Sequence, residues 1–142
     1  MMELDESKVK LAHEMAKKAH EGQLDKAGKD YIGHPEYVAS LFETPEEKII
    51  ALLHDTLEDT DLSPECIKKE FGEQVLEAVV VLTKRKGEEY FSYIERVKAH
   101  PLARRIKIAD LNHNIQIERL AHPEKRDYQR RKKYQEALRR LL

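Results

Sequence analysis

The sequence predicts an all-α protein that folds as one compact bundle of helices over residues 1–142. Apolar side chains recur at helical spacing along most of the chain, as they do from Val9 to Ala19. The one run rich in β-branched residues, Val75 to Leu82, has no partner strand elsewhere in the sequence, so we interpret it as a buried helix. A length of 142 residues suits a single domain, and no repeat or linker divides it.

Local signals place the first helices in order. The first helix is expected to end near Gly22, and residues 23–33, which are polar and contain two glycines, are expected to form an ordered loop. A second helix is predicted to begin near Pro35. A third is predicted to run from about Pro45 through the His54-Asp55 doublet.

The second half of the chain carries equally clear helix signals. Ser63 is a predicted N-cap, because it precedes a proline at the first helical position, and the helix should run to about Phe71. Gly72 then separates it from the buried helix. Further helices are expected over Tyr90 to Ala99, Pro101 to about Ile117, and Pro123 to the C-terminus.

Composition excludes several classes of protein. The formal net charge is -1, so no overall field attracts the chain to a nucleic acid polymer or a membrane. The single Cys66 excludes an internal disulfide and a cysteine-rich zinc site. The acidic start, from Met1 to Glu6, lacks the regions of a signal peptide, and no apolar run approaches the roughly 20 residues of a membrane span. We therefore expect a cytoplasmic protein, and a homo-oligomer is compatible with the sequence.

The last predicted helix is strongly basic and allows two interpretations. It could form a patch for polyphosphate or nucleic acid, or it could be a solvated outer face with Tyr128, Leu138 and Leu141 turned inward. We favour the outer face, because basic surface helices are common and no aromatic platform accompanies this one. Its cations are Lys125, Arg126, Arg130, Arg131, Lys132, Lys133, Arg139 and Arg140.

Two histidines and two aspartates form a candidate metal site. His54 and Asp55 end an apolar run, His34 precedes a proline, and Asp110 follows another apolar segment. Two imidazoles and two carboxylates suit a divalent metal that acts on phosphate esters. Neighbouring helical residues point about 100° apart, so the ligands would come from several helices. Spacing alone is weak support, and an isolated histidine is usually an ordinary core or surface residue, as we expect for His13, His100, His113 and His122.

Short strings around these residues carry a more specific signal. In chain order they are HEGQ at 20–23, DKAGKDYIGHP at 25–35, ALLHDTLEDT at 51–60, FG at 71–72, LTK at 82–84 and KIADLNHN at 107–114. This series resembles the HD-superfamily phosphohydrolases, and within them the hydrolase domain of the RelA/SpoT alarmone enzymes and their small single-domain relatives. The resemblance covers roughly residues 8–120.

The resemblance implies roles for the metal set. His34, His54, Asp55 and Asp110 would hold one divalent ion, Mn²⁺ in most such hydrolases, with Fe²⁺ or Zn²⁺ as alternatives. Metal catalysis lowers the pKa of the attacking water and neutralises charge on phosphate oxygens.

The resemblance also assigns catalytic and substrate-binding residues. Glu58 and Asp59 would orient or deprotonate the attacking water; otherwise they form an acidic helix end that Thr60 caps. Lys26 and Asn114 match positions that contact substrate in the family. Tyr31, in the loop before His34, is expected to pack under a nucleotide substrate.

The predicted activity is hydrolysis of guanosine 3′,5′-bis(diphosphate) at its 3′ position, with release of pyrophosphate. Four positions depart from the alarmone-hydrolase pattern: Asp25 replaces an arginine that packs against guanine, Leu111 a cation, and Gln116-Ile117 an Arg-Thr pair. Fewer cations should weaken binding of such an anionic substrate. Two alternatives therefore stand, an HD hydrolase of another small nucleotide and a non-catalytic module that binds a nucleotide.

Overall fold

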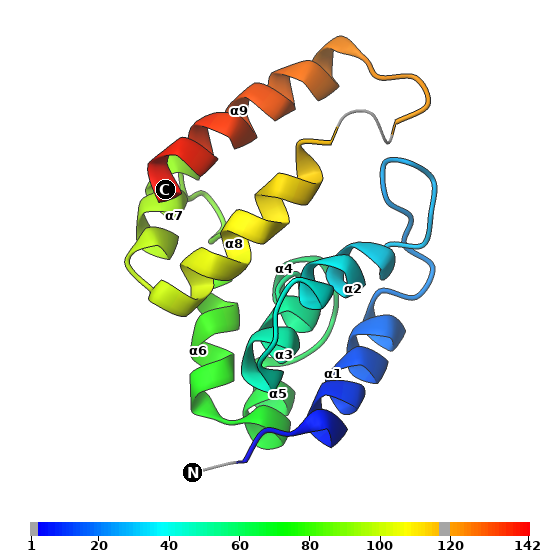
Figure 1. The fold of residues 1–142 in the computed structure, drawn as a ribbon, viewed down its shortest axis with the longest axis vertical. Helices are drawn as coiled ribbons and strands as arrows, with labels where there is room; N and C mark the ends of the chain where they lie inside the picture. The colour runs from blue at the N-terminus through cyan, green and yellow to red at the C-terminus, as the bar shows by residue number, and fades with distance from the viewer. Residues whose placement is uncertain (1–2, 117–119) are drawn as a thin grey trace.

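The computed structural model describes residues 3–116 and 120–142, and the regular structure of these residues is helical (Figure 1). An isolated bridge between Leu24 and Asp30 belongs to no strand. The prediction of an all-α fold is confirmed. The helices are α1 Glu6–Ala19, α2 Gly33–Ser40, α3 Pro45–Leu53, α4 Thr56–Asp59, α5 Pro64–Phe71, α6 Glu73–Leu82, α7 Tyr90–Lys98, α8 Pro101–Asn114 and α9 Lys125–Leu141.

Capping explains where α5 begins and ends. The Ser63 hydroxyl accepts a hydrogen bond of 3.2 Å from the Cys66 amide, and Pro64 occupies the first turn, as predicted. The helix ends at Phe71, where Gly72 takes a φ of 92° that favours glycine and turns the chain into α6. The β-branched run is indeed helical, and it buries one face of α6.

Helix α3 lies at the centre of the molecule. Its residues 49–53 are all buried, because α1, α2, α6 and α8 all pack against it. A helix covered on every side reads as a continuous apolar run in the sequence. Its C-terminal end, where His54 follows, is therefore inside the protein.

The predicted third helix does not continue through the doublet. It stops at Leu53, His54 caps its C-terminus, and Asp55 lies at the N-cap of the separate short helix α4. This break changes the direction of the chain between the two residues of the doublet. The Thr56 hydroxyl helps to fix the break by donating a 2.7 Å hydrogen bond to the Leu53 carbonyl.

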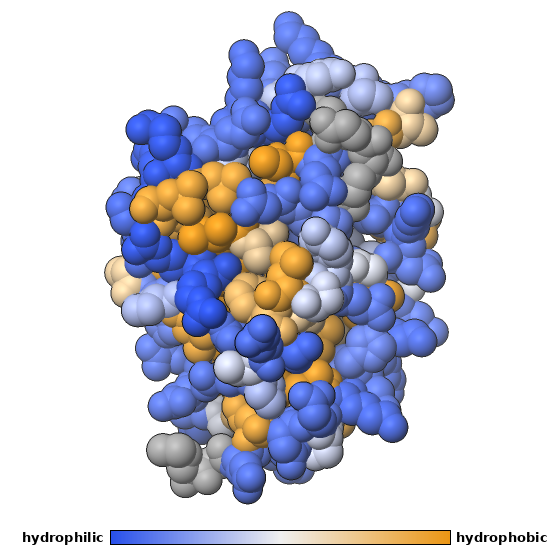
Figure 2. All heavy atoms as spheres, in the orientation of Figure 1, coloured by the Kyte–Doolittle hydropathy of each residue, from blue (hydrophilic) through white to orange (hydrophobic). Residues whose placement is uncertain are grey.

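Helices α8 and α9 form an antiparallel pair, and α7 packs against both of them (Figure 1). Figure 2 shows that this face of the molecule is largely hydrophilic, with apolar side chains gathered in the seam between α8 and α9. Helix α9 begins at Lys125, slightly later than predicted, and α8 ends at Asn114. The expected end of α8 near Ile117 lies outside the described residues, as do Met1 and Met2.

Among the residues that the structure describes, no helix combines the length and the apolar character needed to cross a membrane.

Candidate active site

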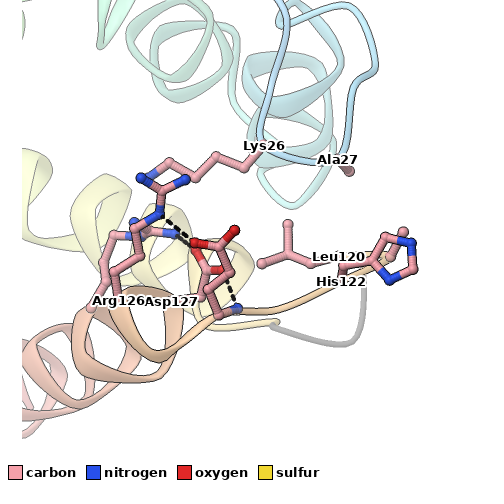
Figure 3. Close-up of a pocket in the computed structure, with 9 residues that line it drawn as sticks. Lys26, Ala27, Leu120, His122, Arg126 and Asp127 are labelled. Atoms are coloured by element: carbon pink, nitrogen blue, oxygen red, sulfur yellow. Dashed lines mark hydrogen bonds and ion pairs between the residues drawn. The ribbon is translucent and has the colours of Figure 1, made fainter.

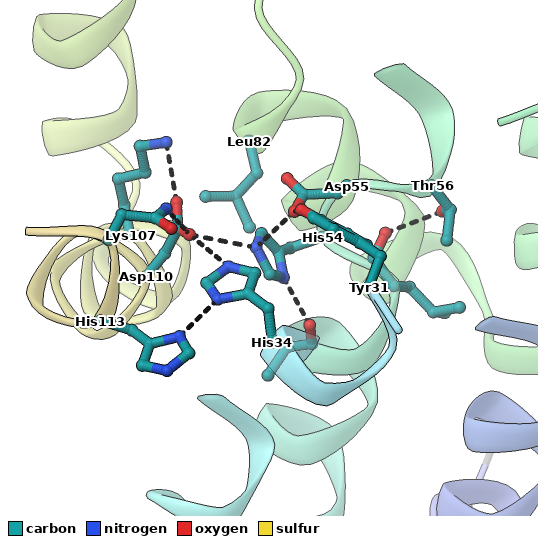
Figure 4. Close-up of polar contacts among 12 residues, drawn as sticks. Tyr31, His34, His54, Asp55, Thr56, Leu82, Lys107, Asp110 and His113 are labelled. Carbon is teal, nitrogen blue, oxygen red and sulfur yellow. Dashed lines mark hydrogen bonds and ion pairs between the residues drawn. The ribbon is translucent and has the colours of Figure 1, made fainter. Parts of the chain in front are cut away.

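Three predicted metal ligands meet where α2, α3 and α8 converge. His34 lies in the first turn of α2, His54 caps the end of α3, and Asp110 lies on α8 (Figure 4). Asp110 Oδ1 lies 2.7 Å from His34 Nε2 and 3.4 Å from His54 Nε2. One ligand atom from each residue lies within 4.8 Å of the others, and all three residues are buried. This spacing is compatible with a shared metal ion.

Asp55, the fourth predicted ligand, lies beside this group of three. Its Oδ2 atom is 3.1 Å from His54 Nε2 and accepts a hydrogen bond from the Tyr31 hydroxyl. Tyr31 belongs to the loop before α2, so this contact joins the predicted substrate loop to the edge of the site (Figure 4). Coordination by Asp55 stays a prediction.

Two of the three grouped side chains, His54 and Asp110, are oriented by a neighbour. His54 Nδ1 lies 2.5 Å from the Ala51 carbonyl, to which it can only donate, so Nε2 points at the carboxylates. That Nε2 atom is buried and has no well-formed hydrogen bond. Asp110 Oδ2 accepts a 2.9 Å hydrogen bond from Lys107, which leaves Oδ1 toward the histidines. A buried imidazole nitrogen that faces two carboxylates without a hydrogen bond of its own fits a metal ligand.

The charges in the group balance one another. Burial tends to raise the pKa of Asp110, but Lys107 and then His54 hold it well below its usual range. Burial opposes ionisation of Asp55 as well, and His54 nevertheless lowers its pKa to about 2. Burial tends to lower the pKa of His54, but the charges of Asp55 and Asp110 raise it well above its usual value. Two ionised carboxylates, of which Asp110 is buried and Asp55 is partly buried, require positive charge beside them, and a divalent cation would provide it.

Glu58 and Asp59 lie on α4, next to the group. Because α3 stops before the doublet, Glu58 reaches the site through this separate turn and not through a continuous helix. Its Oε1 atom accepts a 2.9 Å hydrogen bond from the Lys84 amide. Burial raises the pKa of both carboxyl groups, and the neighbouring Asp55 raises that of Asp59 further. The alternative interpretation, an acidic helix end capped by Thr60, also has some support, because the Thr60 hydroxyl donates a hydrogen bond to the Thr56 carbonyl.

A pocket of about 320 Å³ opens beside these residues. Its lining brings together the 23–33 loop, α4, α8 and α9. Of the predicted site residues, Lys26, Tyr31, His34, Asp55, Glu58, Asp59, Asp110 and Asn114 line it. Asn114 also donates a 2.9 Å hydrogen bond to Asp110 Oδ1. The ligand positions other than His54, the acidic pair and the predicted substrate contacts therefore share one pocket.

The first half of α9 faces this pocket, which Arg130, Arg131 and Tyr134 line. Of the three side chains of α9 that were expected to turn inward, Leu138 and Leu141 are buried, but the expectation is wrong for Tyr128, which is 43% exposed. A neighbouring pocket of about 550 Å³ lies between the loop and the start of α9, and there Lys26 reaches from the loop toward the helix (Figure 3). Burial, followed by the charge of Arg130, lowers the pKa of Lys26. Cations gathered this closely favour an anionic ligand.

A family model described as an HD domain matches residues 12–142 of the chain. The chain belongs to the HD-domain family.

Curated relatives of this HD domain are much longer proteins. The guanosine-3′,5′-bis(diphosphate) 3′-pyrophosphohydrolase of Aquifex aeolicus is 37% identical over 130 residues, which cover 83% of this chain and 19% of that protein. The protein of the same name from Haemophilus influenzae is 36% identical, with coverage of 79% and 19%. A probable GTP pyrophosphokinase of Mycobacterium leprae is 35% identical, with coverage of 82% and 16%. The chain thus spans less than a fifth of these relatives' length.

A solved structure shares the arrangement of helices in this HD domain. It is described as a metazoan ortholog of SpoT that hydrolyses ppGpp and plays a role in starvation responses, and it superposes with a TM-score of 0.81. The match covers 99% of this chain and 88% of the other at 22% sequence identity. The sequence-based resemblance to the RelA/SpoT hydrolase domains is therefore confirmed in the curated relatives, and the HD fold is confirmed in the structure.

Sequence reasoning missed several residues around the HD-domain site. Lys107 and His113 lie three positions before and after Asp110, so helical spacing alone places them near its face. His113 was expected to be an ordinary histidine, yet its Nδ1 atom lies 2.7 Å from His34 Nδ1. His20 is buried at the end of α1 and contacts Gln23, whose side chain donates to the Asp59 carbonyl. The string HEGQ contains both His20 and Gln23, but nothing in it predicted the contact with Asp59.

Proposed function

We propose that this HD domain is a metal-dependent hydrolase that removes pyrophosphate from the 3′ position of guanosine 3′,5′-bis(diphosphate). The observation that carries the proposal is the meeting of His34, His54 and Asp110 in one group, at the edge of a pocket that Glu58 and Asp59 also line. Two curated relatives bear the name of this activity. A small nucleotide is thus the proposed partner of the chain.

The metal ligands in this proposal are His34, His54, Asp55 and Asp110. Their mixture of nitrogen and oxygen donors suits Mn²⁺, and Fe²⁺ or Zn²⁺ also accept such a set. When bound, a divalent ion supplies Lewis-acid catalysis, in which it neutralises charge on the phosphate oxygens and acidifies the attacking water. The unsatisfied Nε2 atom of His54 supports this assignment.

Glu58 and Asp59 are the proposed proton acceptors for the water. A carboxylate whose pKa is raised by burial is a stronger base than an exposed one, so both groups suit this role. In the overall reaction water adds its hydroxyl to phosphorus, the bond between phosphorus and the 3′ oxygen breaks, and that oxygen takes up a proton. The products are pyrophosphate and guanosine 5′-diphosphate.

Substrate binding is assigned to the loop and to α9. Lys26, Arg130 and Arg131 supply positive charge around an anionic nucleotide, and each charge-assisted hydrogen bond contributes about 1.5–3 kcal/mol. Tyr31 packs beneath the nucleotide, and Asn114 contacts its sugar. These arginines offset part of the loss of cations that the sequence suggests.

A second candidate, hydrolysis of another small nucleotide, is favoured by the conformation of Asp25. Its carboxylate accepts hydrogen bonds of 2.8 Å from the Ala27 amide and 3.0 Å from the Lys29 amide, so it closes the turn of the loop. Asp25 occupies the position of the arginine that packs against guanine in the alarmone enzymes, and here it stabilises the turn of the loop. Leu111 is buried and Gln116 lines the pocket, while Ile117 lies outside the described residues.

The deciding experiment measures pyrophosphate and phosphate release from guanosine tetraphosphate alarmone and from a panel of nucleotides. We expect release from the alarmone with Mn²⁺, and loss of release with a chelator or in Asp55→Ala. Release from a different nucleotide, with none from the alarmone, would support the second candidate, hydrolysis of another small nucleotide. Tight binding of a nucleotide without any turnover would instead support the non-catalytic module, and turnover that survives both chelator and Asp55→Ala would contradict metal-dependent hydrolysis.

A further inference from the structure

A pair of buried histidines links α2 to α8. His34 and His113 are 4% and 7% exposed, and their Nδ1 atoms lie 2.7 Å apart. The two rings are nearly parallel, with an interplanar angle of 7° and centroids 5.0 Å apart. Figure 4 shows the ring of His113 on the far side of His34 from His54. The contact joins a proposed metal ligand to a residue that has no role in the proposed reaction.

A contact of this length between two ring nitrogens needs a single hydrogen atom, which one nitrogen donates and the other accepts. The remaining nitrogen of His34, Nε2, faces Asp110 and is the atom that would bind the metal. A metal-bound nitrogen carries no hydrogen, so the hydrogen of a neutral His34 must then lie on Nδ1. It follows that Nδ1 of His113 must carry no hydrogen and that Nε2 of His113 carries it instead.

We propose that His113 is a positioning residue. Its unprotonated Nδ1 accepts a hydrogen bond from Nδ1–H of His34 and holds that ring in the tautomer that can bind a metal through Nε2. The inference rests on the metal centre of the proposed function. Histidine ligands commonly use their second nitrogen in this way, with a carbonyl or a carboxylate as acceptor. Here the acceptor is another imidazole, which has a choice of tautomer of its own.

The surroundings of His113 hold its ring in place for this role. It lies three residues after Asp110 on α8, so both side chains project from one face of the helix. The ring of Tyr37, from the next turn of α2 after His34, stacks on His113 with centroids 4.3 Å apart. His54 has the Ala51 carbonyl for the same purpose, and Asp110 has Lys107. His113 completes the set of groups that orient the three central ligands.

Two variants separate the role of the acceptor from the role of packing. In His113→Asn the side-chain oxygen lies near the former Nδ1 position and still accepts a hydrogen bond. In His113→Leu the volume is largely kept and the acceptor is lost. Loss of such a partner lowers metal affinity about 10–100-fold in other sites, and we expect that range for His113→Leu and near-normal affinity for His113→Asn.

The first measurement is the affinity of metal-free protein for Mn²⁺, by calorimetry, in wild type and both variants. The second is long-range ¹H–¹⁵N NMR of the protein loaded with diamagnetic Zn²⁺, which reports the hydrogen on each ring nitrogen. We expect Nδ1–H on His34 and Nε2–H on His113. Equal Mn²⁺ affinity in wild type and His113→Leu, or a hydrogen on Nδ1 of His113 in the loaded protein, would overturn the inference.

The outcomes also separate this inference from the proposed function. If wild-type protein binds Mn²⁺ but hydrolyses no nucleotide, the proposed reaction is contradicted. The Mn²⁺ affinities of wild type and the two variants still decide the role of His113. Wild-type protein that binds neither Mn²⁺ nor Zn²⁺ overturns both. If His113→Leu fails to fold, as judged by circular dichroism, the NMR spectrum of the loaded wild type and the affinity of His113→Asn remain decisive.

Discussion

Lys107 is a largely buried cation that, together with His54, keeps Asp110 ionised. Its ammonium lies 2.9 Å from Asp110 Oδ2 and 5.3 Å from the centre of the Tyr93 ring, and only 14% of the side chain is exposed. The pKa of Lys107 is itself raised well above its usual value, because Asp110 outweighs the effect of burial. Each partner thus keeps the other charged inside the protein.

Replacing Lys107 with methionine should therefore destabilise the metal-free protein. Removal of one member of a buried ion pair costs about 3–5 kcal/mol, because the other charge stays buried without compensation. Urea unfolding monitored by circular dichroism measures this, and Lys98→Met, on the exposed face of α7, is the matched control. A loss no greater than in Lys98→Met would show that Asp110 does not depend on Lys107.

Glu58 should set the acid side of the pH–rate profile. Burial raises its pKa, and a general base works only when it is ionised, so activity should be lost at a higher pH than an exposed glutamate would give. We expect Glu58→Gln to lower kcat by about 10²–10⁴-fold. Glu14→Gln, on an exposed face of α1, should leave kcat unchanged. The profile of kcat/KM against pH in wild type and both variants tests the role.

At the scale of elements, Arg96 joins α7 to the end of α6. Its guanidinium donates to both carboxylate oxygens of Glu88, at 2.9 and 3.0 Å, and to the carbonyls of Val81 and Thr83. The next residue, Lys84, donates its amide to Glu58. Arg96 thereby fixes the backbone segment that holds a proposed catalytic carboxylate.

Arg96→Lys should destabilise the fold by about 2 kcal/mol, because a lysine cannot form the forked contact. The Arg96 hydrogen bond lowers the pKa of Glu88 to about 2 from an ordinary 4.5, so its stabilisation is present above 4.5 and is lost as the pH falls from there toward 2. Acid unfolding of wild type and variant checks this sign. Curves that stay parallel throughout that range would contradict it.

Particular helices show what the sequence could and could not predict. The bounds of α5 could be predicted from Ser63 and Gly72, because an N-cap and a glycine with positive φ depend only on the local sequence. The break after Leu53 was not predictable, since the apolar run gives no local reason to stop there. It depends on the packing of the buried His54 and the partly buried Asp55 against other parts of the fold. The inward turn of Arg130 on α9 depends in the same way on the position of the loop that carries Lys26.

At the scale of the whole molecule, the proposed metal ion would connect three helices. His34, His54 and Asp110 belong to different parts of the chain, so an ion that binds only the folded arrangement must stabilise it. At a concentration about 100-fold above its Kd, the gain should be about 2.7 kcal/mol. We expect Mn²⁺ to raise the Tm of wild-type protein, and to raise that of Asp110→Asn far less. Equal shifts in the two proteins would place the bound ion elsewhere.

The family and the helical class of the molecule were both predictable from its strings and periodicity. The site was predictable in part, because His34, His54 and Asp110 could be named but their neighbours in space could not. His113 shares a helix face with Asp110, yet only the folded structure brings it against His34. The predicted single domain over residues 1–142, the coordination by Asp55 and the choice of Mn²⁺ stay predictions.

The contact between His34 and Asp110 spans 76 positions of the sequence. The predicted substrate loop, the doublet and the acidic pair therefore emerge from the ribosome before Asp110, the residue that would complete the proposed metal centre. Until α8 has emerged and docked against α2 and α3, a nascent chain holds two histidines without their shared carboxylate. We therefore expect the proposed activity to appear only after α8 has emerged and docked, and a fragment of this chain that stops before α8 should be inert however well its first helices fold.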